Sequence, residues 1–487
     1  MELLVLMNKF AEMEPYYSQD IHALETYQRL IQYFGMAFMA NKKEPIHILD
    51  YMNYSRAVFP EIFKMAEVIR LHEIEPGYMS PDGSYELHQL IKAIEYARLC
   101  RNDPQNAALY HRLVQKAEVG GGNGCSSVVN GVLNSILKLP KAIFSRSNAA
   151  PEIILTLPNY TIYMAQLSQL RAVAVAKYVH AKRENDFLPT FADIRAKVTE
   201  NTVAIILTYP TNPSQATYEG TRLSDLKAII KFCQENGIFL VADNIYQDLL
   251  FPIGRRFEEI FNWTTSLDYL IKVYGSSKDT PFYAGYRTGY WFGDPRIADA
   301  YKYHISSTET SLGTYHLLFF ALNLYFKMLI ISGSKPTLDN MRFFTYGVFG
   351  LTQMVNPEIV LDNILDLDLE NKYQKRLAIS NNIQESSIKQ VKEFMASSDC
   401  FIDYVNQNIG NVFFIRVNPK YFKGNDHDFF EFVLDKAKCA ISPGNVFGMP
   451  LRDGDVWFRI TLIHEKCEDI IDGLHKIESS LRHDSSC

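Results

Sequence analysis

The stretch VAIILTYPTNPSQATYEGTRLSDLKAIIKFCQENGIFLVAD, residues 203–243, decides the fold class. It begins and ends with short apolar runs, at 203–209 and 238–243, which are typical of buried strands. Between them lies a helix-like segment, 224–237, that ends in a glycine well placed to stop a helix. A strand, a helix and a second strand predict a parallel pair with a crossover helix, so the stretch indicates an α/β fold.

The same alternation extends on both sides of this stretch. Further strand-like runs lie at 152–157, 269–275 and 289–294. Together the runs predict a large domain with a mainly parallel central sheet sandwiched by helices. Such sheets bind ligands beyond the carboxyl ends of their strands, so the functional residues are expected there.

The two ends of the chain differ from this central part. Strand-like runs at 411–417 and 456–462 flank a helix-like segment near 427–438, which predicts a smaller α/β domain. The expected division is 1–70 as an N-terminal arm and part of the small domain, 71–334 as the large domain, 335–370 as an insertion, and 371–487 as the C-terminal small domain.

Composition excludes several classes of protein. Of 487 residues, 47% are hydrophobic and 21% charged, as in an ordinary globular protein, and the formal charge of −6 gives no reason to bind nucleic acid or a membrane surface. Seven cysteines, spread singly, fit reduced thiols and a cytoplasmic protein. The histidines show no ligand spacing, so no metal site is expected. The longest apolar run, 317–331, is too short to span a membrane and is interpreted as a buried or subunit-interface helix.

Polar side chains stand where the strand-like runs end. Lys278 lies three residues after the end of the run YLIKVYG, and Asp243 is the last residue of IFLVAD. Tyr246 comes three residues after Asp243, so a helical turn would place both on one side. Asn212 lies in a turn stiffened by two prolines. The segment EVGGGNGCSS, 118–127, leads into a helix-like stretch, and a helix start rich in small residues can bind a phosphate.

These residues match the needs of one cofactor, pyridoxal 5′-phosphate (PLP). PLP requires a lysine for its Schiff base, a carboxylate at the pyridine nitrogen, donors to the phenolate oxygen, an aromatic face and an anion cradle. Lys278 would form the Schiff base, and Asp243 would pair with the pyridinium nitrogen. Asn212 and Tyr246 would donate to the phenolate oxygen, and Tyr160 would stack on the ring. The residues expected to hold the phosphate are Gly124, Cys125, Ser126, Ser277 and Arg287.

On nine motifs, in the family's order, the chain resembles the class I/II aminotransferases among the fold-type I PLP-dependent enzymes. The motifs run from Pro76 to Leu462 and are PGYMSPDGSYEL, NGCSS, PNYTIY, YPTNPSQATY, VADNIY, YGSSKD, GYRTGY, ISPGNVFG and VWFRITL. The resemblance implies an aspartate aminotransferase-like fold and the transfer of an amino group between an amino acid and a 2-oxo acid. Lys278, Asp243 and Tyr246 would be the catalytic residues.

The resemblance also implies partners. Tyr78 would reach the cofactor phosphate of the partner subunit in a homodimer. Arg459, with Asn212 beside it, would hold the α-carboxylate of the substrate, a task suited to a planar guanidinium.

Three features depart from the family pattern. The serine common three residues before the lysine is Gly275 here, and Ser276 is the expected substitute as a cofactor ligand. In the motif N-P-x-G, Gln215 replaces the glycine, which makes the backbone less free. The segment LDYMNYSRAVFP, 49–60, replaces the family's glycine-bearing segment near the substrate, so substrate choice carries over least.

Other functions stay open at the level of sequence. A PLP-dependent lyase or synthase would use the same lysine, since KVYGSSKD also resembles aminocyclopropane-carboxylate synthases, and a C–S lyase belongs to the same class. A non-catalytic PLP-fold binding protein is a further alternative. A nicotinamide oxidoreductase is disfavoured because Cys125 or Ser127 stands where the third glycine of G-x-G-x-x-G belongs.

Overall fold

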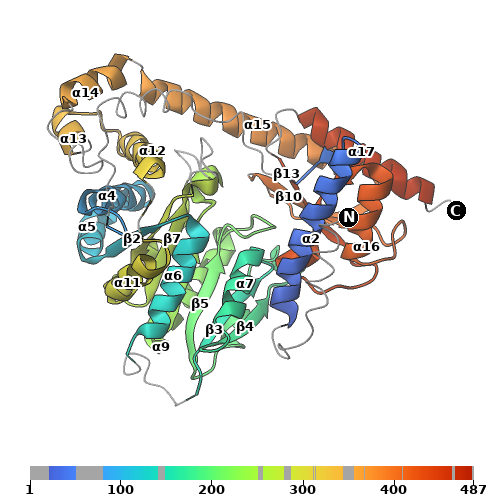
Figure 1. The fold of residues 1–487 in the computed structure, drawn as a ribbon, viewed down its shortest axis with the longest axis horizontal. Helices are drawn as coiled ribbons and strands as arrows, with labels where there is room; N and C mark the ends of the chain where they lie inside the picture. Colours follow the sequence, from blue (N-terminus) through green and yellow to red (C-terminus); the bar gives the residue numbers. More distant parts are fainter. Residues whose placement is uncertain are drawn as a thin grey trace.

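The structure, a computed structural model, arranges the chain in two lobes joined along one side by a long helix (Figure 1). It describes residues 21–484 apart from 51–79, 141–148, 251–255, 279–286, 311, 313, 344–355, 367, 408–409 and 463–466.

A seven-stranded sheet forms the centre of the larger lobe. Its strands are β2 (Glu118–Gly122), β3 (Glu152–Leu157), β4 (Val175–His180), β5 (Thr202–Thr208), β6 (Phe239–Asp243), β7 (Leu270–Gly275) and β8 (Gly289–Gly293), in the order β2-β8-β7-β6-β5-β3-β4. Strand β8 is antiparallel to both β7 and β2, and the remaining pairs are parallel. Six strands therefore run in one direction, which confirms the mainly parallel sheet.

Helices cover both faces of this sheet because its strands are buried on both sides. In β5, Ile205 and Leu207 join one core cluster, whereas Ala204 and Ile206 join another. The first cluster includes α4 (Tyr85–Asn102), α5 (Ala107–Lys116), α8 (Phe191–Arg195), α9 (Leu223–Asn236) and α12 (Thr314–Ser332). The second includes α6 (Cys125–Lys138), α7 (Thr161–Gln169) and α11 (Ala298–Thr308).

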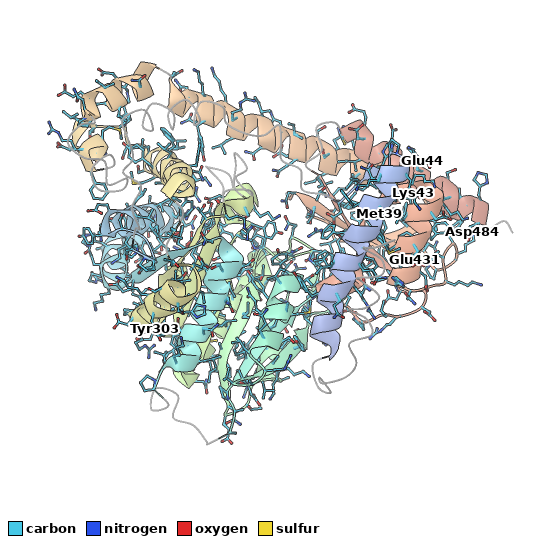
Figure 2. All side chains as sticks on the ribbon, viewed as in Figure 1. Met39, Lys43, Glu44, Tyr303, Glu431 and Asp484 are labelled. Carbon is cyan, nitrogen blue, oxygen red and sulfur yellow. The ribbon has the colours of Figure 1, made fainter. Side chains whose placement is uncertain are left out.

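The smaller lobe combines the N-terminal and C-terminal parts of the chain. Its sheet has the order β12 (Ser442–Pro443), β13 (Trp457–Thr461), β10 (Val412–Val417) and β9 (Phe401–Tyr404). A core cluster of its own includes Tyr33 from α2 (Ile21–Lys43), together with residues of α16 (Asp426–Phe432) and α17 (Cys467–Asp484). Two short strands, β1 (His47–Ile48) and β11 (Cys439–Ala440), pair in parallel. Nearby lies Glu44, which Figure 2 labels at the end of α2, and its carboxylate pairs with Lys438 at 3.5 Å.

The stretch expected to be an insertion contains helices where the structure describes it. These are α13 (Leu338–Arg342) and α14 (Pro357–Asp366), followed by the 29-residue α15 (Leu369–Ser397) that joins the two lobes (Figure 1). The division into domains with the stated boundaries stays a prediction.

Most strand and helix predictions agree with the structure to within a residue or two, but two strands of the seven-stranded sheet, β2 and β4, are additional. In β2, a Cβ atom at Gly120 would lie 2.6 Å from Trp291 Nε1, so the packing of this strand requires a glycine. Glycine is uncommon inside strands, and the sequence therefore does not indicate a strand here. In β4 the residues are mostly half-exposed, and the strand lies at the sheet edge. The apolar run 317–331 lies in α12, where residues 319–327 are buried. Among the described residues, no helix combines the length and apolar character needed to cross a membrane.

A buried network of charges fixes α4 and α12 to the sheet. Lys272 of β7 donates to Glu95 and Glu259 at 2.7 Å each, and all three side chains are fully buried. Arg98 binds Glu95 at 2.6 Å and also pairs with Asp248. Burial alone would raise the pKa of Glu95, but the charges of Lys272 and Arg98 hold it below its ordinary value. Each of these buried carboxylates is stable in the folded protein only because a cationic side chain pairs with it.

Replacing Lys272 by methionine is expected to lower the free energy of unfolding by about 3–5 kcal/mol, because two buried carboxylates lose their shared cation. Urea unfolding measures the change. Lys231 of α9 is a matched control, since it is exposed and pairs with Glu235 at 3.7 Å; Lys231→Met should cost less than about 1 kcal/mol. An equally small loss for both variants would contradict the role given to Lys272.

Candidate active site

The carboxyl ends of four parallel strands bring the predicted residues to one edge of the sheet. Asp243 is the last residue of β6, and Lys278 lies in the 3-10 turn that follows β7. Asn212 follows β5, and Tyr160 follows β3 at the start of α7. Strand β2 runs in the same direction, so the start of α6 reaches this edge as well. The sheet therefore gathers five separate segments around one site.

Asp243 lies at the bottom of this site, and only 2% of it is exposed. Its carboxylate accepts hydrogen bonds from the Tyr163 hydroxyl at 2.6 Å, the Ile245 backbone at 3.1 Å and the Cys125 thiol at 3.3 Å. The Thr208 hydroxyl donates more weakly, at 3.4 Å. These four donors are all neutral.

Burial raises the pKa of Asp243, although its hydrogen bonds act in the opposite direction. A buried carboxylate with neutral donors gains most from a positively charged partner. A protonated pyridine nitrogen is such a partner, so the surroundings of Asp243 fit the electron-sink end of PLP.

A cradle for an anion lies at the start of α6. Gly124 precedes this helix with φ of 90°, a conformation that favours glycine. A Cβ atom at Gly124 would lie 2.9 Å from Nη2 of Arg287, so the absence of a side chain lets the guanidinium approach the helix start. The helix dipole and Arg287 both favour negative charge there. Ser126 and the half-buried Ser127 belong to the first turn, and this arrangement fits the phosphate of PLP.

The structure gives a physical reason for Gly275. A Cβ atom at this position would lie 3.0 Å from Cβ of Cys125 and 3.2 Å from its backbone nitrogen. Strand β7 therefore packs so closely against the start of α6 that a serine here would require its neighbours to move by a few tenths of an ångström. Ser276 is buried, and its hydroxyl contacts Oγ1 of Thr288 at 2.8 Å and its carbonyl oxygen at 3.2 Å. Ser277 is also buried, and the cofactor roles of both serines stay predictions.

Lys278 is partly buried among positively charged groups. Burial lowers its pKa to about 7, and the charges of Arg459 and Arg287 add to this effect, whereas Asp50 opposes it. At neutral pH about half of the Lys278 side chains are then uncharged, the form that acts as a nucleophile or a base.

The lowered pKa predicts a distinct reactivity of Lys278 in the cofactor-free protein. Acetylation of Lys278 by trace acetic anhydride should rise to half its maximum near pH 7, whereas an ordinary lysine amine titrates near about 10.4. Mass spectrometry of the Lys278 peptide measures this, with free Nα-acetyl-lysine in the same tube as the internal standard. If Lys278 labels in parallel with the standard, the cationic surroundings described above are wrong.

Arg459 and Asn212 meet at the small-lobe side of the site. Nη1 of Arg459 donates to Oδ1 of Asn212 at 2.8 Å, which turns the amide nitrogen of Asn212 away from the arginine. The guanidinium lies 4.7 Å from the centre of the Phe447 ring. Burial raises the pKa of the nearby Tyr246, and the charge of Arg459 opposes this rise. The structure thus brings the predicted substrate-binding residues close to Lys278.

Gln215 adopts the backbone conformation that the family motif assigns to glycine. Its φ is 59°, in the left-handed region. The side chain compensates by donating to the Thr211 carbonyl at 3.2 Å and accepting from the Asn411 backbone at 3.4 Å. The expected turn is therefore made despite the substitution.

Two residues at the site were not predicted from the sequence. Tyr163 reaches Asp243 from α7, three residues after Tyr160, whose side chain is 39% exposed. Asp50 pairs with Arg459 at 3.0 Å. The only sequence signal for Asp50 is an acidic residue after the apolar run IHIL. Tyr78 lies outside the described residues.

A possible metal group is also present in the described part of the chain. Asp399, Cys400 and Glu478 offer ligand atoms within 4.8 Å of one another. Arg482 already pairs with Asp399 at 2.5 Å and with Glu478 at 2.8 Å, so the two carboxylates share a cation that the protein itself supplies.

Comparisons with known proteins identify the family of the chain. The family model described as aminotransferase class I and II matches residues 77–322. A probable aspartate/prephenate aminotransferase of Aquifex aeolicus is 25% identical over 337 residues, 68% of this chain and 70% of that protein. An asparagine–oxo-acid transaminase of Streptococcus mutans is 27% identical over 48% of this chain and 53% of its own length.

Solved structures share the fold. An aromatic aminotransferase from Pyrococcus horikoshii superimposes with a TM-score of 0.65 at 16% identity, covering 93% of this chain and 100% of that one. A Thermus thermophilus aspartate aminotransferase mutant gives the same TM-score and identity, over 92% and 96%. This chain belongs to the class I and II aminotransferase family. Enzymes of this family generally depend on PLP.

Proposed function

We propose that this protein uses PLP to move an amino group between an amino acid and a 2-oxo acid. The observation that carries the proposal is the placement of Lys278, an amine with a pKa lowered to about 7, at the same sheet edge as the buried Asp243. Arg287 at the start of α6 supports it, because a phosphate would lie there.

Each residue then has a defined task. Asp243 keeps the pyridine nitrogen protonated, and Tyr163 and Cys125 hold the carboxylate in place. The amide nitrogen of Asn212 and the hydroxyl of Tyr246 donate to the phenolate oxygen. Tyr160 supplies the aromatic face. The phosphate ligands are the backbone and side chains of 124–126, Ser276, Ser277 and Arg287.

When bound, PLP supplies the electron sink that stabilises the negative charge left at Cα of the amino acid. Lys278 removes the Cα proton with its uncharged amine and returns it later in the reaction. Arg459 orients the substrate through its α-carboxylate. Burial, with a smaller contribution from the charges of Arg459 and Arg287, lowers the pKa of Lys278 so that its amine can act as a base at neutral pH.

The proposal extends to assembly and location. We infer a homodimer in which Tyr78 of one subunit reaches the phosphate of its partner, and a cytoplasmic protein with reduced cysteines. The six cysteines among the described residues are free thiols, which supports a reducing compartment.

Absorbance and product analysis together test this function. PLP-loaded protein should show a visible band that shifts when a suitable amino acid is added. Relatives named for aspartate, asparagine and glutamate suggest these donors for the first screen, with one 2-oxo acid as acceptor. Formation of the new amino acid supports the aminotransferase. Release of ammonia or a thiol without transfer would favour the lyase, and a colourless protein after incubation with PLP would contradict both.

A further inference from the structure

Arg459, the residue proposed to hold the substrate carboxylate, already has a carboxylate partner within the chain. Its Nε lies 3.0 Å and 3.3 Å from the two oxygens of Asp50, and its Nη2 lies 3.0 Å from Oδ2. These two nitrogens form one of the edges of the guanidinium that offer two parallel N–H groups to a carboxylate, and Nη1 on the other side already donates to Asn212. The Asp50 side chain is fully buried, and that of Arg459 is 11% exposed.

The backbone holds Asp50 in this position. Leu49, the preceding residue, donates from its backbone nitrogen to the carbonyl of Ala440 at 2.8 Å. The carbonyl of Leu49 accepts from the backbone nitrogen of Thr461 at 2.8 Å and from its hydroxyl at 3.1 Å. Thr461 is two residues after Arg459 in β13. The carboxylate and the guanidinium are thus attached to the same piece of the small-lobe sheet.

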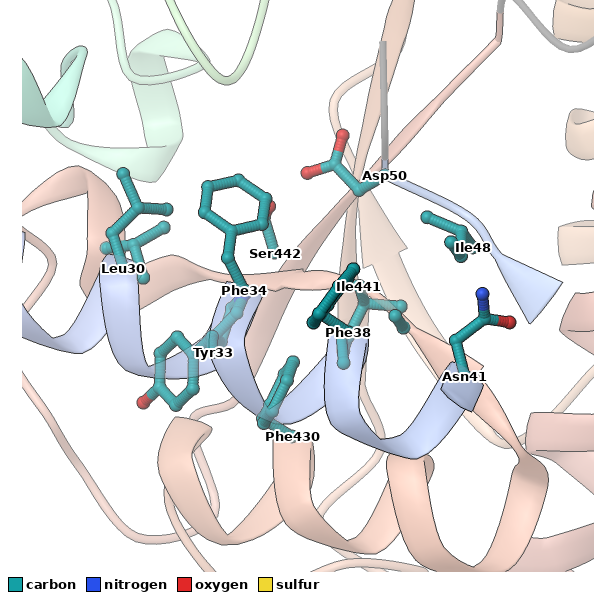
Figure 3. A pocket seen from close by; sticks show the side chains of 14 residues that line it. Leu30, Tyr33, Phe34, Phe38, Asn41, Ile48, Asp50, Phe430, Ile441 and Ser442 are labelled. Atoms are coloured by element: carbon teal, nitrogen blue, oxygen red, sulfur yellow. The ribbon is translucent and has the colours of Figure 1, made fainter. Parts of the chain in front are cut away.

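Asp50 has Arg459 on one side and, on the other, a space that is unsuited to a carboxylate. A pocket of about 330 Å³ lies there, between α2 and strands β11 and β12. Its walls are mainly apolar, with Phe34, Phe38, Ile48 and Ile441 among them (Figure 3). A carboxylate that left Arg459 for this pocket would lose its charged partner and find no cationic side chain in the pocket lining to replace it. Asp50 therefore stays with Arg459 when another carboxylate approaches.

We propose that Asp50 is a specificity-determining residue that occupies the carboxylate-binding edge of Arg459, so that every substrate carboxylate must compete with it. The proposal rests on the role of Arg459 in the proposed function. The expected consequence is weak binding of simple carboxylates, because the guanidinium is already neutralised and Asp50 repels a second negative charge. Selectivity for a substrate then comes from contacts away from its carboxylate.

Binding of an unreactive carboxylate tests the proposal. The probe is 3-phenylpropionate, and 3-phenylpropionamide is the uncharged match. Calorimetry should give at least a tenfold lower Kd for the carboxylate with Asp50→Asn than with the unchanged protein, and no difference for the amide. Asp50→Glu keeps the charge and should not tighten binding. Asp50→Ala serves where the asparagine variant folds poorly, which melting curves reveal.

A second part of the experiment shows whether the tighter binding of the carboxylate depends on Arg459. In the double variant Asp50→Asn, Arg459→Gln, the tenfold gain should disappear. Equal or weaker binding of the carboxylate by both Asp50→Asn and Asp50→Ala would overturn the proposal, as would a gain that survives without Arg459. Measurements on both PLP-loaded and cofactor-free protein separate the two questions: failure to bind PLP contradicts the proposed function but leaves the competition between Asp50 and carboxylates measurable.

Discussion

Replacing Lys278 by alanine is expected to lower kcat by roughly a thousandfold or more, because the chain loses the base that moves the Cα proton. The variant should also lose the visible band of the PLP-loaded protein. Both are measured on the same sample, with the best donor and acceptor from the screen. The fold should persist, since the amine is partly buried among cations and its removal relieves repulsion from Arg459 and Arg287.

Lys231→Ala is the matched control for this variant. Lys231 is exposed on α9 and pairs only weakly, with Glu235 at 3.7 Å, so its removal should leave kcat and the absorbance unchanged. Retention of a tenth or more of the activity by Lys278→Ala would show that another group moves the proton.

Replacing Asp243 by asparagine should also lower kcat by roughly a thousandfold, while the protein still binds PLP. The reason is that the carboxylate supports the pyridinium charge, whereas the phosphate is held elsewhere, by the start of α6 and Arg287. Turnover assays and a PLP titration followed by absorbance measure the two quantities separately.

For Asp243→Asn we expect a loss of activity but a gain in the stability of the cofactor-free protein. Burial raises the pKa of Asp243, so the folded cofactor-free protein holds this proton more tightly than the unfolded chain. The charged carboxylate therefore costs stability above the ordinary pKa, and this cost grows as the pH rises through the raised value. Asp243→Asn should melt at a higher temperature than the unchanged protein at pH 8, with a smaller difference at pH 4.

The control for Asp243 is an exposed acidic residue. Asp339 of α13 has a side chain that is 91% exposed, and Asp339→Asn should change neither turnover nor melting temperature. If Asp243→Asn lost PLP binding and turnover to the same extent, the carboxylate would be a binding group rather than a support for the electron sink.

The parts of the site that could be predicted are those fixed by short-range signals. Asp243, Lys278 and Asn212 each lie at the end of an apolar run or within three residues of it, and a parallel sheet places such positions together whatever the rest of the chain does. Gly124 could also be predicted from a short-range signal, in this case the small residues that precede a helix-like stretch. The family resemblance then added Arg459 and the order of the motifs.

The remainder depends on packing that no local pattern encodes. Asp50 is 409 residues away from Arg459 in sequence, and nothing near either residue indicates the pair. Lys272 interrupts the apolar run of β7, but its two carboxylate partners come from α4 and the loop after α10 (Gln247–Leu250). In β2, three successive glycines are typical of a loop in sequence, and only the structure shows Trp291 packed against Gly120.

The hydrogen bonds between Leu49 and Thr461 have a consequence for protein synthesis. The last of the seven strands of the large sheet ends at Gly293. The whole sheet can therefore form while the chain is still being made. Asp50 leaves the ribosome early, but the strand to which Leu49 bonds is made only with Trp457–Thr461. During translation the cofactor edge can therefore fold first, and the carboxylate-binding side is among the last parts of the protein to form.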